Sequence, residues 1–195
     1  MCIRDRYYTD GQFSDEYKAF YDTGELMMIS HFENGKRIGN SKEYYKDGML
    51  KTEAEFNNGI QSGTTKWYYE SGKLKGNYNY ETNQLEGLSV EYYEIGTVES
   101  ERNYKYGKQN GLSKVYFENG TLKSEENFKN GAREGITKSY YQNGSLWTEQ
   151  NYIKNKLEGE TKIYREDKSL WYVEKYKEGV LKSSMEYAKD GSEVG

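Results

Sequence analysis

The chain has 195 residues, but only 34% of them are hydrophobic and the mean hydropathy is -1.14, which excludes a thick apolar core. Disorder is also disfavoured, because the chain contains 22 Tyr and no Pro, whereas disordered chains are poor in aromatic residues and rich in Pro. The net charge of -4 argues against nucleic acid as a partner and disfavours anionic membranes, since both require clustered positive charge.

The first six residues, MCIRDR, match no later position of the sequence. We interpret residues 1–6 as a leader that is either non-native or frayed, and residues 7–191 as one continuous array. Cys2 is the only cysteine, so no disulfide within the chain is expected. The sequence shows no signal peptide or transmembrane segment. Localisation therefore stays unknown, with the cytoplasm as the default.

From residue 7 onward the sequence repeats every 24 residues. A first column of the repeat holds the glycines that we expect at structural turns: Gly24, Gly48, Gly72, Gly96, Gly120 and Gly144. A second column holds only Gly or Asn: Gly11, Gly35, Gly59, Asn83, Gly107, Gly131, Asn155 and Gly179. A third column is again glycine: Gly39, Gly63, Gly87, Gly111, Gly135 and Gly159. Gly and Asn best tolerate positive φ, so the second column predicts left-handed turn positions. The third column predicts a bulge or a close backbone approach.

Two short runs of aromatic and aliphatic residues lie between the glycines in each repeat. In one repeat they are Tyr44–Tyr45 and the segment from Leu50 to Phe56, and the even spacing within the second run keeps its large residues on one face of a strand. Turn pairs such as Asp47–Gly48 between the runs are typical of hairpins. We therefore predict an all-β fold, an elongated single-layer antiparallel meander of about eight 24-residue β-hairpin repeats.

A two-residue turn at Asp47–Gly48 fixes the expected pairing across each hairpin. The pairing would bring these residues opposite one another: Tyr45 and Leu50, Tyr44 and Lys51, and Lys42 and Glu53. The lysine column would then face the glutamate column in several repeats, which predicts a ladder of opposite charges. A solvated polar face without a specific role is the alternative.

The pattern Tyr-Tyr-x-x-Gly-x-Leu-Lys-x-Glu-x-x-Phe-x-x-Gly occurs at residues 44–59 and, with Phe117, at residues 116–131. It resembles the bacterial MORN-repeat variant, to which YwqK-type antitoxins of toxin-antitoxin systems belong, and the resemblance covers residues 7–191. It implies an elongated antiparallel sheet and a protein partner, a toxin or another protein. The sequence departs from the pattern at these positions: Asn83, Asn155, Arg165 and Lys168. Such degeneracy is common in terminal repeats. We interpret residues 192–195 as a tail, and a truncated C-terminus is one interpretation of it.

The sequence predicts no enzyme, cofactor site or metal site. His31 is the only histidine, which excludes a Ser-His-Asp triad and a site with several histidine ligands. We expect it to be an ordinary histidine of a strand. The acidic residues recur in columns, which favours a structural role because a catalytic pair of carboxylates would be unique.

Two tryptophans break the symmetry of the repeats. Trp147 and Trp171 occupy a position that holds Met, Lys or Glu in the other repeats. Under the expected register Trp147 faces Tyr140 and Trp171 faces Tyr164, and the four side chains form one patch. Because Trp and Tyr concentrate binding energy at interfaces, these four residues are the candidate partner-binding site. The alternative is that they cover the end of a thin sheet. Trp67 is expected in the core.

The sequence thus favours a non-enzymatic scaffold that binds a protein, with the antitoxin of a toxin-antitoxin pair as one form of it. A second hypothesis is an exported or envelope-associated repeat protein that binds glycan or the cell surface. A third is peripheral binding to membrane lipid. The open edges of the predicted sheet would also allow self-association.

Overall fold

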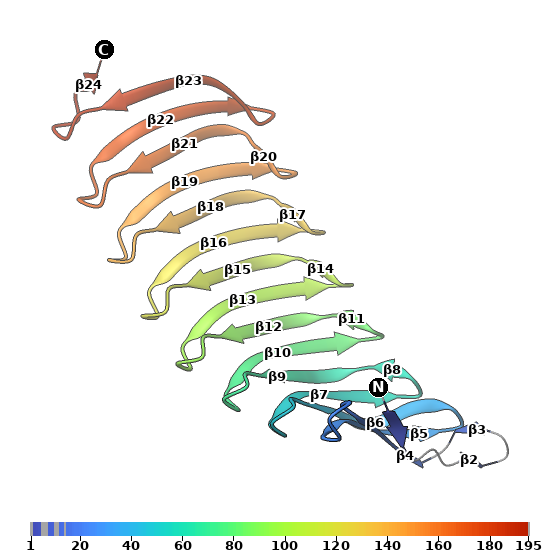
Figure 1. Cartoon of the computed structure of the whole chain (residues 1–195). Coiled ribbons are helices and arrows are strands. Elements are labelled where there is room, and N and C mark those ends of the chain that lie inside the picture. The colour runs from blue at the N-terminus through green and yellow to red at the C-terminus, as the bar shows by residue number, and fades with distance from the viewer. Residues whose placement is uncertain (1, 5–7, 10–11, 14, 195) are drawn as a thin grey trace. The chain divides into compact units, whose positions relative to one another are not determined.

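The computed structural model describes residues 2–4, 8–9, 12–13 and 15–194, and every regular element in these ranges is a β-strand (Figure 1). The predicted all-β antiparallel meander is therefore confirmed. The chain divides after Gly96 into two units. Four predicted features lie outside the described residues: leader residues 1, 5 and 6, Gly11 of the second glycine column, Gly195 of the tail, and residue 7 at the start of the array.

Unit 1, residues 1–96, consists of strands that mostly pair with the next strand along the chain. Its strands are β1 (Cys2–Arg4), β2 (Tyr8–Thr9), β3 (Gln12–Phe13), β4 (Asp15–Phe20), β5 (Leu26–Glu33), β6 (Lys36–Tyr44), β7 (Leu50–Asn57), β8 (Ile60–Gln61), β9 (Gly63–Tyr68), β10 (Leu74–Glu81), β11 (Gln84–Leu85) and β12 (Gly87–Tyr92). Strand β1 pairs with β4, so residues 2–4 of the predicted leader join the sheet.

Unit 2, residues 97–195, repeats the same hairpin. Its strands are β13 (Val98–Lys105), β14 (Lys108–Gln109), β15 (Gly111–Tyr116), β16 (Leu122–Lys129), β17 (Ala132–Arg133), β18 (Gly135–Tyr140), β19 (Leu146–Ile153), β20 (Lys156–Leu157), β21 (Gly159–Tyr164), β22 (Leu170–Lys177), β23 (Val180–Tyr187) and β24 (Glu193–Val194). Strand β24 pairs with the end of β23, so the predicted tail supplies the strand that follows the turn at Gly191.

The second glycine column forms the tight, two-residue turns. Between Asn57 and Ile60, which are paired, the loop is Asn58–Gly59, and φ is positive at both residues, 52° and 83°. Two consecutive positive φ values define the type I′ turn, whose twist matches that of the flanking strands. Asn83 and Asn155 take the glycine position with φ of 63° and 67°. The prediction of left-handed turn positions in this column is confirmed.

The first glycine column forms a longer loop than predicted. The Tyr45 N–H donates to the Met49 carbonyl at 2.8 Å, and the Gly48 N–H donates to the Tyr45 carbonyl at 3.0 Å. The loop therefore has three residues, 46–48, with Gly48 at a φ of 87°. This is the hairpin in which a turn is followed by a left-handed residue. The two-residue turn predicted at Asp47–Gly48 is wrong.

The longer loop changes the pairing of the aromatic residues beside it. Lys42 lies opposite Glu53 as predicted, but Tyr44 lies opposite Leu50, and the register shifts at this point. Lys51 is the extra residue of a β-bulge. The predicted pairs of Tyr45 with Leu50 and of Tyr44 with Lys51 are therefore wrong.

The third glycine column lies where a strand changes its register. Strand β7 pairs with β8 through Phe56 and Gln61, and then with β9 through Glu53 and Lys66. Gly63 lies between these two registers with a φ of 76°, and a Cβ there would meet the Glu55 carboxylate at 2.6 Å. The structure agrees with the predicted bulge.

Small hydroxyl side chains, and not large apolar ones, are the most buried residues. The buried positions of one column are Ser41, Thr65, Ser89, Ser113, Thr137 and Thr161. Ala19 is the only buried hydrophobic residue among the side chains that the structure describes. In a thin sheet only a short side chain can be fully covered by its larger neighbours on the same face. The predicted absence of a thick apolar core is confirmed.

The predicted ladder of opposite charges is present and extends over neighbouring hairpins. In unit 2 residues of alternating charge lie in register on successive strands: Glu101, Lys114, Glu125, Lys138, Glu149 and Lys162. The Lys138 Nζ lies 3.6 Å from the Glu149 carboxylate, and in unit 1 the Lys42 Nζ lies 3.4 Å from that of Glu53. A slip of the register by one residue would break these pairs, so the ladder helps to fix the register.

Candidate binding surface

In several repeats the bulge next to the three-residue loop brings a side chain to the residue that precedes the loop. In three repeats the bulge residue is lysine, and its Nζ lies over the ring of the residue that precedes the loop. Lys75 lies 5.4 Å from the ring centroid of Tyr69, and Lys123 lies 5.6 Å from that of Phe117. Lys51 and Tyr45 are 5.8 Å apart in the same way. These are cation–π distances, so the bulge and the loop together build a recurring pair of a cation and a ring.

The pair changes in the C-terminal repeats. At Trp147 the lysine is replaced by a second aromatic residue, whose ring centroid lies 5.9 Å from that of Tyr141 at an interplanar angle of 44°. In the next repeat the two partners exchange positions: the guanidinium of Arg165 precedes the loop and lies 5.2 Å from the ring centroid of Trp171. The cation–π contact is thus kept at Trp171 and lost at Trp147.

Arg165 also takes over a hydrogen bond of the tyrosine that it replaces. In other repeats this tyrosine donates from its hydroxyl to a backbone carbonyl in the next hairpin, as Tyr141 does to Tyr164 at 2.9 Å. The Nη2 of Arg165 donates to the carbonyl of Tyr187 at 2.7 Å, and its Nη1 to that of Leu170 at 2.9 Å. The guanidinium of Arg165 therefore makes the two contacts that the ring and the hydroxyl of the tyrosine make in other repeats.

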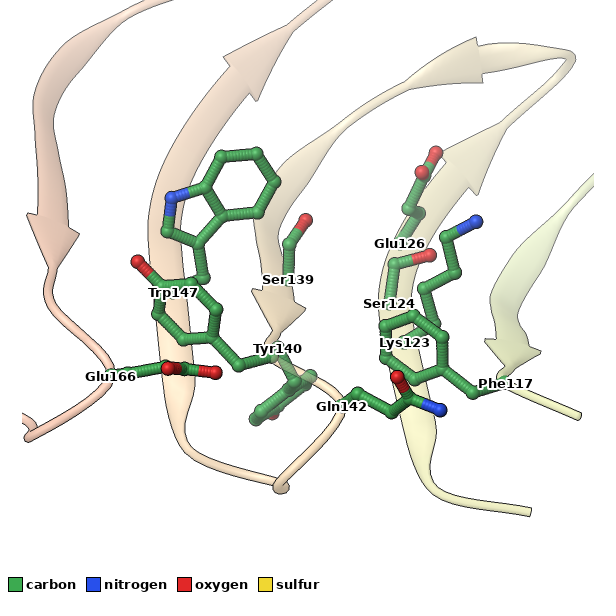
Figure 2. Close-up of a pocket in the computed structure, with 10 residues that line it drawn as sticks. Phe117, Lys123, Ser124, Glu126, Ser139, Tyr140, Gln142, Trp147 and Glu166 are labelled. Atoms are coloured by element: carbon green, nitrogen blue, oxygen red, sulfur yellow. The ribbon is translucent and has the colours of Figure 1, made fainter. Parts of the chain in front are cut away.

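A cavity of about 510 Å³ lies beside Trp147 in unit 2 (Figure 2). Its walls are formed by ten residues: Phe117, Lys123, Ser124, Glu126, Ser139, Tyr140, Tyr141, Gln142, Trp147 and Glu166. Figure 2 shows Trp147 and Glu166 on one side, with Phe117 and Lys123 across from them. We call this feature the Trp147 cavity. Three successive hairpins of the array contribute to it.

The charged residues around the Trp147 cavity differ in whether they are neutralised. The Glu126 carboxylate accepts a hydrogen bond from the Nε of Arg133 at 2.8 Å. Glu166 makes no ion pair within the part of the chain that the structure describes. Burial, and then the negative charges of Glu166 and Asp167, raise the pKa of the Tyr141 hydroxyl. The side of the cavity around Trp147 and Tyr141 is therefore aromatic and negatively charged.

The repeats match a known family. Six segments match the MORN repeat variant: residues 16–34, 37–58, 61–82, 85–106, 109–130 and 133–154. Together they cover most of the chain. The chain belongs to this family. No curated protein matches it. MORN repeats form non-catalytic scaffolds that bind proteins or membranes, and the MORN hairpin continues beyond residue 154 in strands β20 to β22 with the same spacing.

The observed strand pairing differs from the pairing predicted for the candidate site residues. Tyr140 is opposite Leu146, and Tyr164 is opposite Leu170, because Trp147 and Trp171 are bulge residues. The predicted facing of each tryptophan and its tyrosine is therefore wrong. Trp147 and Tyr140 nevertheless both contribute to the wall of the Trp147 cavity, whereas Trp171 and Tyr164 do not.

The two C-terminal tryptophans also differ in their partners. The indole N–H of Trp171 donates to the Glu186 carboxylate at 3.1 Å, and Arg165 covers its ring. Trp147 is 46% exposed, and its N–H has no hydrogen-bond partner among the residues that the structure describes. Of the two, Trp147 is the more exposed and has the N–H that is free within the described residues, whereas Trp171 is 37% exposed with both its ring and its N–H engaged.

Sequence reasoning missed Phe117, Tyr141 and Glu166 as residues of the site. The aromatic residue six positions before Trp147 belongs to a column that is visible in the sequence, but its contact with the bulge residue depends on a three-residue loop. Trp67, predicted in the core, is 41% exposed and makes an edge contact with Tyr78 at 6.3 Å. That prediction is wrong, because the covered positions of the sheet hold Ser and Thr.

The described part of the chain contains no group of three or more His, Cys, Asp or Glu residues that could hold a metal ion. It contains no helix long and apolar enough to cross a membrane. His31 lies in β5, exposed, with its Nε2 3.7 Å from a carboxylate oxygen of Glu16.

Proposed function

We propose that this MORN-repeat chain is a scaffold that binds a protein partner at the Trp147 cavity. The observation that carries the proposal is the exposed indole of Trp147 beside Tyr141, in a concave site to which four aromatic side chains contribute. Tryptophan and tyrosine residues that fill pockets at interfaces supply most of the binding energy in many complexes. The fold does not require a tryptophan at this bulge, because three other repeats form it with a lysine.

The proposal can be tested by photo-crosslinking in the cells that produce the chain. Gln142 lines the cavity and makes no side-chain hydrogen bond to a described residue, so a photoreactive amino acid can replace it while Trp147 stays in place. We expect a crosslink to one discrete protein. Glu70 holds the same repeat position in unit 1 and is the matched control, from which that crosslink should be absent.

A second variant separates binding from folding. Trp147→Lys restores the residue that the repeat has at Lys51, Lys75 and Lys123, and a lysine there can lie over the ring of Tyr141 as those lysines do over theirs. We expect it to fold normally and to lose the crosslink at residue 142. An unchanged crosslink in Trp147→Lys, or a crosslink to lipid or glycan alone, would contradict the proposal.

The resemblance to YwqK-type antitoxins supports a toxin as the partner to test first. In this form of the proposal the scaffold neutralises the toxin by holding it. Co-expression of the chain with the product of the neighbouring gene should relieve growth arrest that this product causes alone, and Trp147→Lys should fail to relieve it. Equal rescue by both would argue against an antitoxin that works through the Trp147 cavity.

A further inference from the structure

Most aromatic rings in front of a three-residue loop are covered by a cation of this chain. Tyr45, Tyr69 and Phe117 each have a lysine over the ring, at 5.8, 5.4 and 5.6 Å. Tyr21 has the Nζ of Lys46 at 5.7 Å. The geometry of the hairpin therefore places a cation on this ring as a rule, which is a favourable arrangement because the face of an aromatic ring is electron-rich.

The ring of Tyr141 has a different neighbour. The lysine position holds Trp147, and no cation–π contact involves Tyr141 or Trp147 in the part of the chain that the structure describes. The exchange adds a second ring 5.9 Å away, and indole attracts cations more strongly than phenol does. The rings of Trp147 and Tyr141 therefore lie side by side at a position where other repeats have a lysine over one ring.

A carboxylate completes this arrangement. Glu166 lines the cavity on the same side as Trp147 (Figure 2), and it forms no ion pair among the described residues. The neighbouring Asp167 is engaged, because the Lys189 Nζ lies 3.0 Å from its carboxylate. A positive charge between the rings would therefore meet an acidic group that has no other cation.

The positive charges near the cavity are already occupied. Lys123 lies over Phe117 on the opposite side. Arg133 is held by Glu126 at 2.8 Å and lies 5.4 Å from the ring centroid of Tyr152. Lys123 lies across the cavity from Glu166, and Arg133 does not line the cavity, so the charged residue on the side of Trp147 is the acidic Glu166 (Figure 2).

We propose that the Trp147 cavity recognises a basic side chain, lysine or arginine, of the partner protein, and that this cation stacks on Trp147 and Tyr141 and pairs with Glu166. This rests on the proposed function and adds the chemistry of the bound group. The partner's cation takes the place that lysine has in the other repeats.

The test uses the full chain labelled with ¹⁵N and two short probes. The probes are acetyl-Gly-Arg-Gly-amide and the uncharged control acetyl-Gly-Gln-Gly-amide. We expect the indole N–H resonance of Trp147 to shift in a saturable way with the arginine probe only. The indole resonances of Trp67 and of Trp171, which already has Arg165 over its ring, are internal controls and should not shift.

Two variants assign the shift to the site. Glu166→Gln should weaken the affinity for the arginine probe about threefold, as expected for one exposed charge pair. In Trp147→Lys the indole signal is gone, so backbone amides of residues 141 and 166 report instead, and they should no longer respond because the new lysine occupies the site.

An equal response to the glutamine probe, or no response to the arginine probe, would overturn this inference. The proposed function is tested separately, because it depends on whether a protein is captured through Trp147 and not on the response to the arginine probe. If the partner is captured through Trp147 but the arginine probe gives no response, the proposal of a basic side chain is wrong and the proposed scaffold function still stands.

Discussion

Arg165 shows how a single residue can preserve a repeat after its aromatic side chain is lost. Its guanidinium lies over Trp171 and donates to two backbone carbonyls, those of Leu170 and Tyr187. In the sequence, Arg165 is a departure from the repeat of the kind that is common in terminal units. The structure adds that the planar, multiply donating side chain of arginine makes both of the contacts that tyrosine makes elsewhere.

Replacement of Arg165 therefore has an expected cost. Arg165→Ala removes two charged hydrogen bonds and the cation over Trp171, and we expect it to destabilise the last hairpins by about 1–2 kcal/mol. Hydrogen exchange of the β22 and β23 amides, compared with the unchanged protein, measures this. Arg165→Tyr, which restores the residue of the repeat, is the matched control and should cost less than about 0.5 kcal/mol. Equal protection in Arg165→Ala and the unchanged chain would contradict the role given to the guanidinium.

A tyrosine of the candidate site is expected to link stability to alkaline pH. Burial and a 2.8 Å hydrogen bond to Glu125 raise the pKa of Tyr140 from 10.0 to about 12. Because the folded pKa lies above the unfolded one, Tyr140 stabilises the fold fully below pH 10, and this contribution is lost as the pH rises towards about 12.

The cause can be checked by titrating the ring of Tyr140 with ¹³C NMR. Glu125→Gln should lower the pKa of Tyr140, although burial keeps it above 10.0. Glu101→Gln is the control, since Glu101 accepts from Tyr116 instead. A pKa of Tyr140 that does not respond to Glu125→Gln would mean that the hydrogen bond has no part in the shift.

Among single residues, the sequence singles out Trp147 and Tyr140 but does not indicate that Tyr141 and Glu166 lie beside them. A residue that departs from a column is visible in one sequence, and Trp147 does so. Its contact with Tyr141 and its closeness to Glu166 depend on a β-bulge, and a bulge leaves no composition signal of its own here. The buried column of Ser and Thr was also present in the sequence. It was overlooked because small polar residues are expected at the surface.

At the level of the hairpin, the positions of the turns were predictable and their lengths were not. Positive φ at Gly48 and Gly59 follows from the residue type. Asp-Gly and Asn-Gly, however, fit both a two-residue turn and a three-residue loop with glycine in its left-handed position. The predicted pairing of Lys42 with Glu53 is correct even though the predicted loop length is wrong. The longer loop shifts the register by one residue, and the bulge at Lys51 shifts it back.

The charge ladder permits a quantitative test at this level. A double-mutant cycle with Lys138→Ala and Glu149→Ala, followed by urea unfolding, should give a coupling of about 0.2–1 kcal/mol. Lys162 and Val173 are opposite one another in the same unit but without opposite charge, and the equivalent cycle should give a coupling near zero. Equal couplings in the two cycles would show that the ladder adds nothing beyond side-chain packing.

At the scale of the whole molecule, stability depends on contacts between neighbouring hairpins. Within each unit the strands pair along the chain and bury hydroxyl side chains between larger neighbours. Repeat arrays of this kind behave as a sum of local units with terms between neighbours. The sequence predicted this architecture well, since glycine spacing, aromatic pairs and charges agree on one period.

Local damage should therefore stay local. Thr137 is buried in β18, and Thr137→Lys should accelerate amide hydrogen exchange in β16 to β21 by at least about tenfold, because a buried charge has no partner there. The amides of β5 to β9 in unit 1 should keep their protection. A uniform loss of protection over both units would instead indicate one cooperative domain.

The departure from the repeat at Trp147 is expected to create the binding site of the scaffold. The most direct test is to measure, by calorimetric titration, the affinity of Trp147→Lys for the partner protein that crosslinking identifies. Trp67→Lys is the control for loss of an exposed tryptophan. We predict a loss of affinity of about 30-fold or more at Trp147, the size of an interface hot spot, and less than about twofold at Trp67. Affinities that are equal for the two variants would contradict the account.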